Sequence, residues 1–361
     1  MRTFVKGAME RMITAIPLPV YQFLMRMEVI GLFYHVVSNR SLSHVRNLFP
    51  YKTPEMFERD LIYLKQHFNP ISYEQAFDSL CRNARREPNN VLLTLDDGYA
   101  ECFTIVRPLL LKHGIPCIFF VTTAFIDNKR MFYRNKVSLC IERVSTFGNT
   151  ELGKFLKQVK ANFGQDLRDL KSFLRWIKSL QYEDEETIEG VCGILGLDLD
   201  EYLAIQRPYL SSGQVRRLVS DGFTIGGHSK NHPRLGRLTD KEIEYELVGS
   251  CETVRALTGQ ERVPFCFPFS GHGVNESLLE RLLEQHPFIG LLFDTMGMRK
   301  TKAFVMNRVW ADQPPPEGAN RSNLPTILHA AFRDQWAARL GIDGRLFGGH
   351  DWATNSITSV L

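Results

Sequence analysis

The sequence lacks several features that mark specialised classes of protein. It contains no CxxC pair, no internal repeat and no low-complexity tract. Its seven cysteines are scattered and odd in number, which indicates reduced thiols in a cytoplasmic protein rather than a disulfide framework. No block of lysine and arginine stands out although the formal net charge is +4, so nucleic acid is not an expected partner.

Long apolar runs are also missing, and none of the uninterrupted stretches is long enough to span a bilayer. The amino-terminal stretch is basic and then apolar, but prolines and charged residues break it and no small-residue cleavage site follows. We expect residues 1–28 to form a lead-in helix over Met9–Met27 that packs on the domain. Peripheral contact of this helix with the inner face of a membrane is the alternative.

Short apolar runs alternate with helical stretches, which predicts parallel strands joined by helices. Six runs are typical of strands: Val29–Val37, Val91–Leu95, Cys117–Thr122, Thr224–Gly227, Phe265–Phe269 and Ile289–Phe293. From about 138 to 207, apolar residues recur at helical spacing without a strand, which predicts a helical insertion that caps one end of the fold. The expected domains are the lead-in helix (1–28), an α/β domain (29–137 and 208–312), the insertion (138–207), and a carboxyl-terminal helix and tail (313–361).

Two adjacent carboxylates, Asp96 and Asp97, follow the predicted strand Val91–Leu95. Like charges in contact raise each other's pKa and destabilise the fold unless a cation neutralises them. Taken alone, the Asp-Asp-Gly sequence is also an ordinary turn. The pair therefore indicates a functional site only if the rest of the chain supplies a cation.

Two histidines, His228 and His232, follow another predicted strand, and their spacing lets both imidazoles share one ion. Because the carboxyl ends of parallel strands share one face, we expect them to lie near Asp96 and Asp97; two polar residues on an exposed turn are the alternative. One carboxylate and two histidines are a common Zn²⁺ ligand set with a position open for water. Non-haem Fe(II) oxygenases use the same donors, but a second carboxylate that can act as a base favours hydrolysis.

Three stretches resemble the successive motifs of the polysaccharide deacetylase family, carbohydrate esterase family four. They are TLDDGY at Thr94–Tyr99, HSKNH at His228–His232 and FCFPFSGH at Phe265–His272. Residues 29–137 and 208–312 also resemble the exopolysaccharide and lipopolysaccharide-type branch. The resemblance implies a distorted (β/α) barrel with its site at the carboxyl ends of the strands. It also implies a metal-dependent hydrolase that removes an N-acetyl or another short acyl group from a sugar of a cell-surface polysaccharide or its precursor.

The resemblance further assigns roles to individual residues. Asp96 matches the catalytic base, and Asp97, His228 and His232 match the ligands of a divalent metal, which we expect to be zinc. Phe269 matches the position whose backbone N–H stabilises the oxyanion, a role that needs no particular side chain.

Two further residues are expected to bind the substrate. Tyr99 closes the first motif. His35, in the first predicted strand, is placed to line the mouth of the barrel, with a buried core histidine as the alternative.

The third motif departs from the family pattern, in which an arginine pairs with the base. Arg262–Phe265 (RVPF) fits that pattern literally, whereas Cys266–Phe269 (CFPF) fits its position at a strand end, and we prefer the second. The base then needs another partner, for which Arg308 and His272 are the candidates. The family's late histidine, a general acid, has no clear match; His272 is the first candidate and His350 the second.

Two other functions remain open at this point. The chain could be a deformylase or amidase that acts on a glycolipid or a non-sugar amide. It could also be a family member of impaired activity with a binding role, because the arginine of the third motif and the general acid are unassigned.

Overall fold

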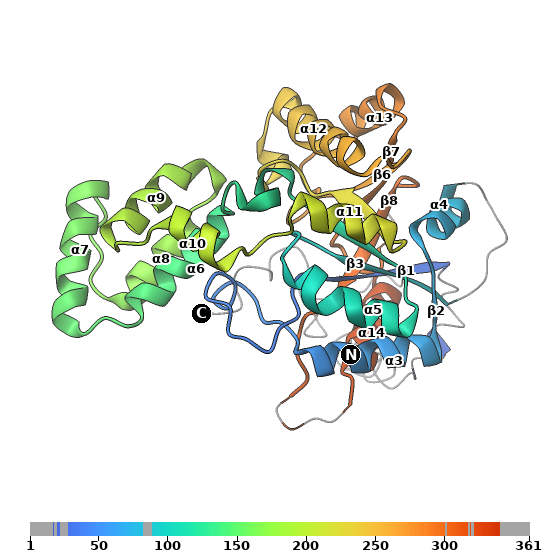
Figure 1. Cartoon of the computed structure of the whole chain (residues 1–361), viewed down its shortest axis with the longest axis horizontal. Coiled ribbons are helices and arrows are strands. Elements are labelled where there is room, and N and C mark those ends of the chain that lie inside the picture. Colours follow the sequence, from blue (N-terminus) through green and yellow to red (C-terminus); the bar gives the residue numbers. More distant parts are fainter. Residues whose placement is uncertain are drawn as a thin grey trace, which may run out of the picture.

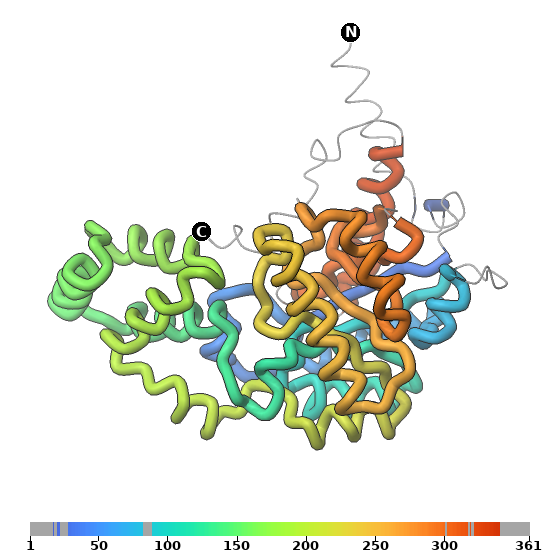
Figure 2. The backbone as a smooth tube through the Cα atoms, turned by 90° about the horizontal axis from the view of Figure 1, so that it is seen from above, coloured from blue at the N-terminus to red at the C-terminus, as the bar shows by residue number. Residues whose placement is uncertain are grey.

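The computed structural model describes residues 17, 20–21, 28–81, 89–299, 302–316, 318 and 321–339. Most of the predicted lead-in helix, as well as His350, lies outside these residues. A parallel α/β barrel and a separate lobe of helices lie side by side along the longest axis (Figure 1). The view from above shows the same two parts (Figure 2). Among the described residues, no helix combines the length and the apolarity needed to cross a membrane.

Within the described ranges, eight parallel strands form the sheet, and seven of them close into a barrel. They are β1 (Val29–Tyr34), β2 (Asn69–Pro70), β3 (Asn90–Leu95), β4 (Cys117–Val121), β5 (Thr224–Gly227), β6 (Val263–Cys266), β7 (Ile289–Asp294) and β8 (Val305–Trp310). β1 lies between β8 and β3, and this pairing closes the ring; the short β2 pairs only with the start of β3. The carboxyl ends of all seven barrel strands therefore meet at one rim.

Five of the six predicted strands are confirmed, with shifts of up to three residues at their ends. The prediction for Phe265–Phe269 is wrong in extent, because β6 ends at Cys266 and the following residues form a loop. β8 was not predicted. Its sequence, VMNRVW, places Asn307 and Arg308 in the middle of the strand, and these two buried polar residues hide the apolar pattern.

Helices connect the barrel strands and cover the outside of the ring. They are α3 (Pro54–His67), α4 (Tyr73–Cys81), α5 (Arg107–His113), α11 (Ser212–Ser220), α12 (Asp240–Thr258), α13 (Glu276–Gln285) and α14 (Leu324–Arg339). Side-chain caps fix where several of them begin. The Ser211 side chain accepts from the Gln214 N–H and the Gln214 side chain accepts from the Ser211 N–H, which is the predicted capping box.

The lobe consists of α6 (Tyr133–Val144), α7 (Asn149–Phe163), α8 (Leu170–Ser179), the short 3-10 helix η3 (Tyr182–Asp184), α9 (Glu185–Ile194) and α10 (Leu199–Gln206). The helical content predicted for 138–207 is confirmed, although the first helix begins earlier, at Tyr133. The lobe has its own apolar core, in which Phe155 and Phe173 pack edge to face with ring centroids 5.0 Å apart. Its entry segment packs on the rim where the barrel strands end, since the Phe132 ring lies 4.2 Å from that of His232.

Candidate metal centre

Asp97, His228 and His232 converge at the rim of the barrel. Asp97 follows β3, and both histidines follow β5, which is two strands away across β4. The Oδ1 atom of Asp97 lies 3.1 Å from Nε2 of His232 and 3.4 Å from Nε2 of His228, and the two Nε2 atoms are 3.2 Å apart. All three side chains are buried, so barrel closure places three metal-ligating groups together away from solvent.

These separations fit a divalent metal ion. Atoms held about 2.0–2.1 Å from a tetrahedral ion lie ~3.3 Å from one another, and the three observed edges agree with that value. The Nδ1–H of His228 donates to the carbonyl of Cys266 at 2.9 Å, which leaves its Nε2 lone pair directed into the cluster. The structure therefore brings the predicted ligand set together in a form able to hold a metal ion.

The backbone around the cluster is strained. Asp97, Ser229, His232 and Phe269 have φ values of 71°, 60°, 63° and 61°, in the left-handed region that non-glycine residues rarely adopt. Each such residue costs about 1–3 kcal/mol, and strain of this kind clusters at functional sites. The neighbouring contacts hold it in place; for example, the Ser229 hydroxyl accepts from the His232 N–H at 2.9 Å.

In the metal-free protein, one histidine of this cluster is protonated. Burial lowers the pKa of His228, but the neighbouring Cys266 and Asp97 groups outweigh it and raise that pKa to about 10. Burial also lowers the pKa of His232. For Asp97, burial raises the pKa, but hydrogen bonds from both imidazoles outweigh this effect and bring the pKa well below its usual value. One proton on His228 therefore takes the place that a cation would fill.

Asp96, the predicted base, pairs with Arg308 from β8. The guanidinium donates from Nη1 to Oδ1 at 2.7 Å and from Nη2 to Oδ2 at 2.8 Å, and both side chains are buried. Burial raises the pKa of Asp96, but Arg308 outweighs it and lowers that pKa below its usual value. Asp96 is thus held as a carboxylate beside Asp97.

Arg308 rather than Arg262 is the arginine at the site. Arg262 lies at the opposite end of β6, where it stacks on Phe77 at 4.0 Å and pairs with Glu74 at 3.2 Å. The sulfur of Cys266, at the end of β6, accepts from Nη2 of Arg308 at 2.8 Å. The preferred reading of the third motif agrees with this geometry.

A second charged pair lies at the same rim, formed by His35 after β1 and Asp312 after β8. Nδ1–H of His35 donates to Oδ2 of Asp312 at 2.5 Å, and Nε1–H of Trp310 donates to the same oxygen at 2.7 Å. Burial lowers the pKa of His35, but Asp312 outweighs it and raises that pKa to about 9. The His35 side chain is 19% exposed, whereas Asp312 is fully buried. Sequence reasoning missed Asp312 because it missed β8.

Phe269 closes the rim above the cluster. Its ring packs edge to face on that of His232 at 4.9 Å, and its carbonyl accepts from the Thr295 hydroxyl at 2.7 Å. The Arg234 guanidinium lies over this ring, 4.3 Å from its centroid.

Two predicted site residues lie elsewhere. Tyr99 is fully buried between barrel and lobe, stacks on Tyr209 at 5.9 Å and accepts a hydrogen bond from Asn135 at 3.0 Å. This position is not exposed to a substrate. His272 is exposed in the loop after β6, and its backbone N–H donates to Ser270. Among the described residues, no contact joins its side chain to Asp96.

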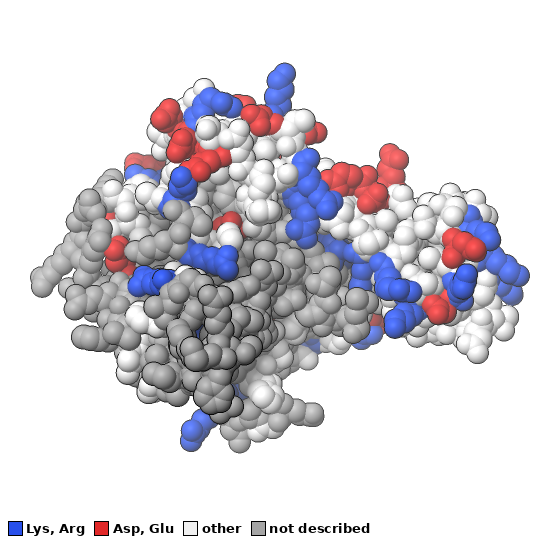
Figure 3. Space-filling view, turned by 180° about the vertical axis from the view of Figure 1, so that it is seen from behind, with Lys and Arg blue, Asp and Glu red and all other residues white. Residues whose placement is uncertain are grey.

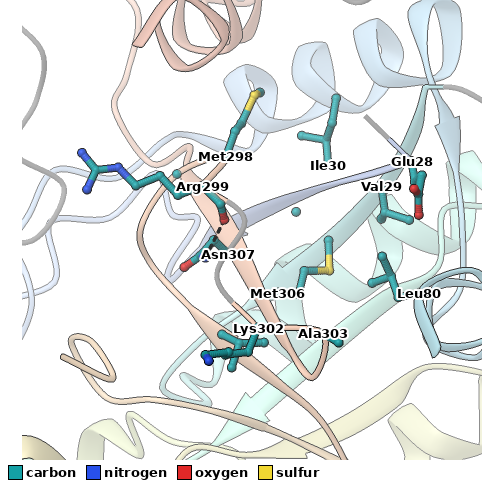
Figure 4. Close-up of a pocket in the computed structure, with 13 residues that line it drawn as sticks. Glu28, Val29, Ile30, Leu80, Met298, Arg299, Lys302, Ala303, Met306 and Asn307 are labelled. Atoms are coloured by element: carbon teal, nitrogen blue, oxygen red, sulfur yellow. Dashed lines mark hydrogen bonds between the residues drawn. The ribbon is translucent and has the colours of Figure 1, made fainter. Parts of the chain in front are cut away.

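A separate cavity of ≈ 320 Å³ lies at the other end of the strands (Figure 4). It is lined by the first residues of β1 and β8 and by the loop between β7 and β8, and Asn307 donates to the Arg299 carbonyl there at 2.6 Å. The carboxylates and imidazoles described above do not line it.

Residues 176–286 match the family model described as polysaccharide deacetylase. This part of the chain is similar to the polysaccharide deacetylase family. The matched range contains both histidines and the third motif, and barrel closure adds Asp96 and Asp97 to them.

Several solved structures are similar to the chain. The Streptococcus pyogenes deacetylase PplD, solved in complex with acetate, has a TM-score of 0.51 at 15% identity, covering 84% of this chain and 97% of that chain. IcaB from Ammonifex degensii gives a TM-score of 0.47 at 15% identity, covering 84% of this chain and 97% of that one. The BpsB deacetylase domain from Bordetella bronchiseptica gives a TM-score of 0.46 at 17% identity, covering 78% of this chain and 95% of that one. No curated protein sequence matches the chain significantly. The predicted polysaccharide deacetylase barrel is confirmed by the likeness to PplD.

Proposed function

We propose that the protein is a metal-dependent hydrolase that removes an N-acetyl group from a sugar of a cell-surface polysaccharide or its precursor. One observation carries this proposal: a buried Asp-His-His cluster shares the rim of the barrel with an arginine-paired carboxylate and a carboxylate-paired imidazole. Deacetylation needs a base for water and an acid for the departing amine, and these two pairs supply them. The motifs favour the exopolysaccharide and lipopolysaccharide-type branch.

Asp97, His228 and His232 would hold the metal, which we propose to be zinc because two imidazoles and one carboxylate suit it. When bound, such an ion supplies Lewis-acid activation of water and polarises the acyl carbonyl.

The residues of the chain supply the proton transfers. Asp96, kept ionised by Arg308, accepts a proton from the attacking water. His35, kept protonated by Asp312, donates a proton to the departing amine nitrogen. The N–H of Phe269 donates to no acceptor among the described residues and is our candidate for the oxyanion donor. The general acid is thus His35 rather than His272.

Acetate release from an N-acetylated oligosaccharide tests this proposal. Activity should disappear with a chelator and return with added metal. Asp96→Asn should retain metal and fold but lose about 10²–10⁴-fold in kcat, the usual contribution of a general base. Loss of metal from this variant would show that the roles of Asp96 and Asp97 are interchanged. Release of formate instead of acetate would identify a deformylase, and metal binding without turnover would identify a binding role.

We further propose a cellular location for the protein. The cytoplasm, with peripheral contact to the inner membrane face, stays a prediction from the cysteine content and the amino-terminal sequence.

A further inference from the structure

A group of cations lies between the lobe and the rim of the barrel. Arg134 belongs to α6, Lys178 to α8, and Arg234 and Arg237 to the loop and short 3-10 helix η4 (Leu235–Arg237) after the metal-ligating histidines. Lysine and arginine side chains gather along the boundary between the two parts of the molecule (Figure 3). We call these four residues the junction cations.

Arg234 links this group to the metal centre. Its guanidinium lies over the Phe269 ring, which in turn packs on His232. Its Nε–H donates to Oε1 of Gln181 in the lobe at 3.2 Å. The two terminal amino groups donate to no acceptor among the described residues, so the side of the guanidinium that best binds an anion is unused.

Neighbouring cations of the same junction are neutralised. Arg130 pairs with Glu185, and Lys136 pairs with Glu185 at 2.6 Å and with Glu189 at 2.5 Å. Arg130 and Lys136 thus each have a carboxylate partner within the protein, as is typical of cations with a structural role.

The junction arginines differ in this respect. Within the described part of the chain, Arg134, Arg234 and Arg237 form no ion pair with a carboxylate. Arg134 is only 5% exposed, and its Nη1 donates merely to the carbonyl of Lys178 at 3.1 Å. A buried cation without a counter-charge is costly.

Mutual repulsion adds to that cost. Burial lowers the pKa of Arg134, and the charge of Arg234 lowers it further. Burial likewise lowers the pKa of Lys178, to which the charge of Arg134 contributes. The carboxylate whose charge acts on Arg234 is Glu183, which is exposed and forms no ion pair with Arg234 in the described part of the chain. A set of like charges assembled beside a reaction centre is typical of a site for an anion.

We propose that the junction cations bind an anionic group, a phosphate or a carboxylate, carried by the acetylated sugar. This inference rests on the proposed deacetylase function and adds the charge of the substrate to it. Arginine forks match the geometry of both anions. Arg234 stacks directly on Phe269 and therefore lies close to the metal centre. An anion bound by Arg234 would belong to the same sugar that enters the metal centre, and its binding would orient the acyl group.

Turnover of matched substrates tests the inference in the metal-loaded full-length protein. Three N-acetylhexosamine substrates are compared: a neutral oligomer, a phosphomonoester and an oligomer with uronic acid residues. We expect KM to be about 10- to 100-fold lower for one of the charged substrates, as a charge-assisted hydrogen bond allows. The two charged arms separate phosphate from carboxylate. Equal kcat/KM for all three would overturn the inference.

Variants separate anion binding from a structural role. Arg234→Gln and Arg237→Gln should raise KM for the charged substrate by about 10-fold or more and weaken its dependence on salt. Arg234→Lys should restore part of the loss, because it keeps the charge without the fork. Arg255→Gln is the matched control, since Arg255 also stacks on a phenylalanine, Phe288, at 5.0 Å but lies on α12 away from the junction. An equal rise in KM for neutral and charged substrates would show that Arg234 only supports Phe269. Because Arg237 is exposed, Arg237→Gln keeps the test valid if Arg234→Gln fails to fold.

A binding measurement distinguishes this inference from the proposed function. If no acetylated sugar is hydrolysed, the proposed function fails, and calorimetry with inorganic pyrophosphate and chelator-treated protein still reports on the cations. Binding that Arg234→Gln removes and Arg255→Gln keeps would support the anion site. Absence of binding, or equal binding by both variants, would overturn it.

Discussion

The pair of Asp96 and Arg308 offers the sharpest test of the site. Arg308→Met keeps much of the side-chain length but removes the charge, leaving Asp96 buried without a counter-ion. Removing one partner of a buried ion pair costs about 3–5 kcal/mol of stability. Because burial raises the pKa of Asp96 and Arg308 is the largest charge that opposes this, the pKa of Asp96 should rise in the variant, and a smaller fraction of it should be able to act as a base.

The sign of the pH effect follows from the lowered pKa of Asp96. A depressed carboxyl pKa stabilises the native protein above the unfolded value of ~3.9 and loses that contribution as the pH falls through the native value. In Arg308→Met this contribution disappears, and the acidic limb of the kcat/KM profile should move to higher pH. Urea unfolding and a pH–rate series measure the two effects.

Two matched variants control for simple destabilisation. Lys52→Met breaks another buried ion pair, Lys52 with Asp60 at 2.5 Å, so it should lose comparable stability while the acidic limb stays in place. Arg262→Met removes a half-buried arginine from the other end of the barrel and should leave activity within a few-fold. The double variant Arg308→Met, Asp96→Asn should recover stability, since neither charge remains. An unchanged acidic limb in Arg308→Met would refute the assignment of Asp96 as an arginine-supported base.

Three other outcomes are expected. The raised pKa of His35 stabilises the metal-free protein fully below pH ~6.5, and about 3 kcal/mol should be lost as the pH rises through about 9. Asp312→Asn should abolish that pH dependence and lower kcat. Urea unfolding from pH 6 to 10 measures the pH dependence, and an equal loss of unfolding free energy in the wild type and in Asp312→Asn would contradict the pairing. Zinc binding near pH 7 should release about one proton, because His228 is protonated without metal. Calorimetry in buffers of different ionisation enthalpy measures this number, and no release would argue against His228 as a ligand. Gly31→Ala would place a Cβ 2.7 Å from Cγ of Arg308 and should cost ~1–3 kcal/mol together with activity. Gly193→Ala, which meets nothing within 4 Å on α9, is its control and should be neutral or stabilising.

The sequence alone determined the metal cluster. Asp97, His228 and His232 each lie within a few residues of the end of an apolar run, and parallel strands bring their carboxyl ends to one rim whatever the details of packing. The helical insertion was equally readable, because its apolar residues keep helical spacing over many turns.

The partner of Asp96 was decided only by the tertiary structure. Arg308 lies 212 residues from Asp96 in the chain, and the sequence left His272 as an equal candidate for the partner of Asp96. What selects Arg308 is the closure of the barrel, which places β8 beside β1 with Gly31 opposite Arg308. The missing Cβ of Gly31 leaves room for the guanidinium stem.

The same closure created the second pair. His35 and Asp312 are 277 residues apart, and each follows its strand by one or two residues. The register that sets Phe33 opposite Trp310 brings their side chains together just beyond the paired strands. Local pattern could not reveal this, because polar Asn307 and Arg308 conceal β8, and a pairing between the two ends of the sheet exists only once the ring is closed.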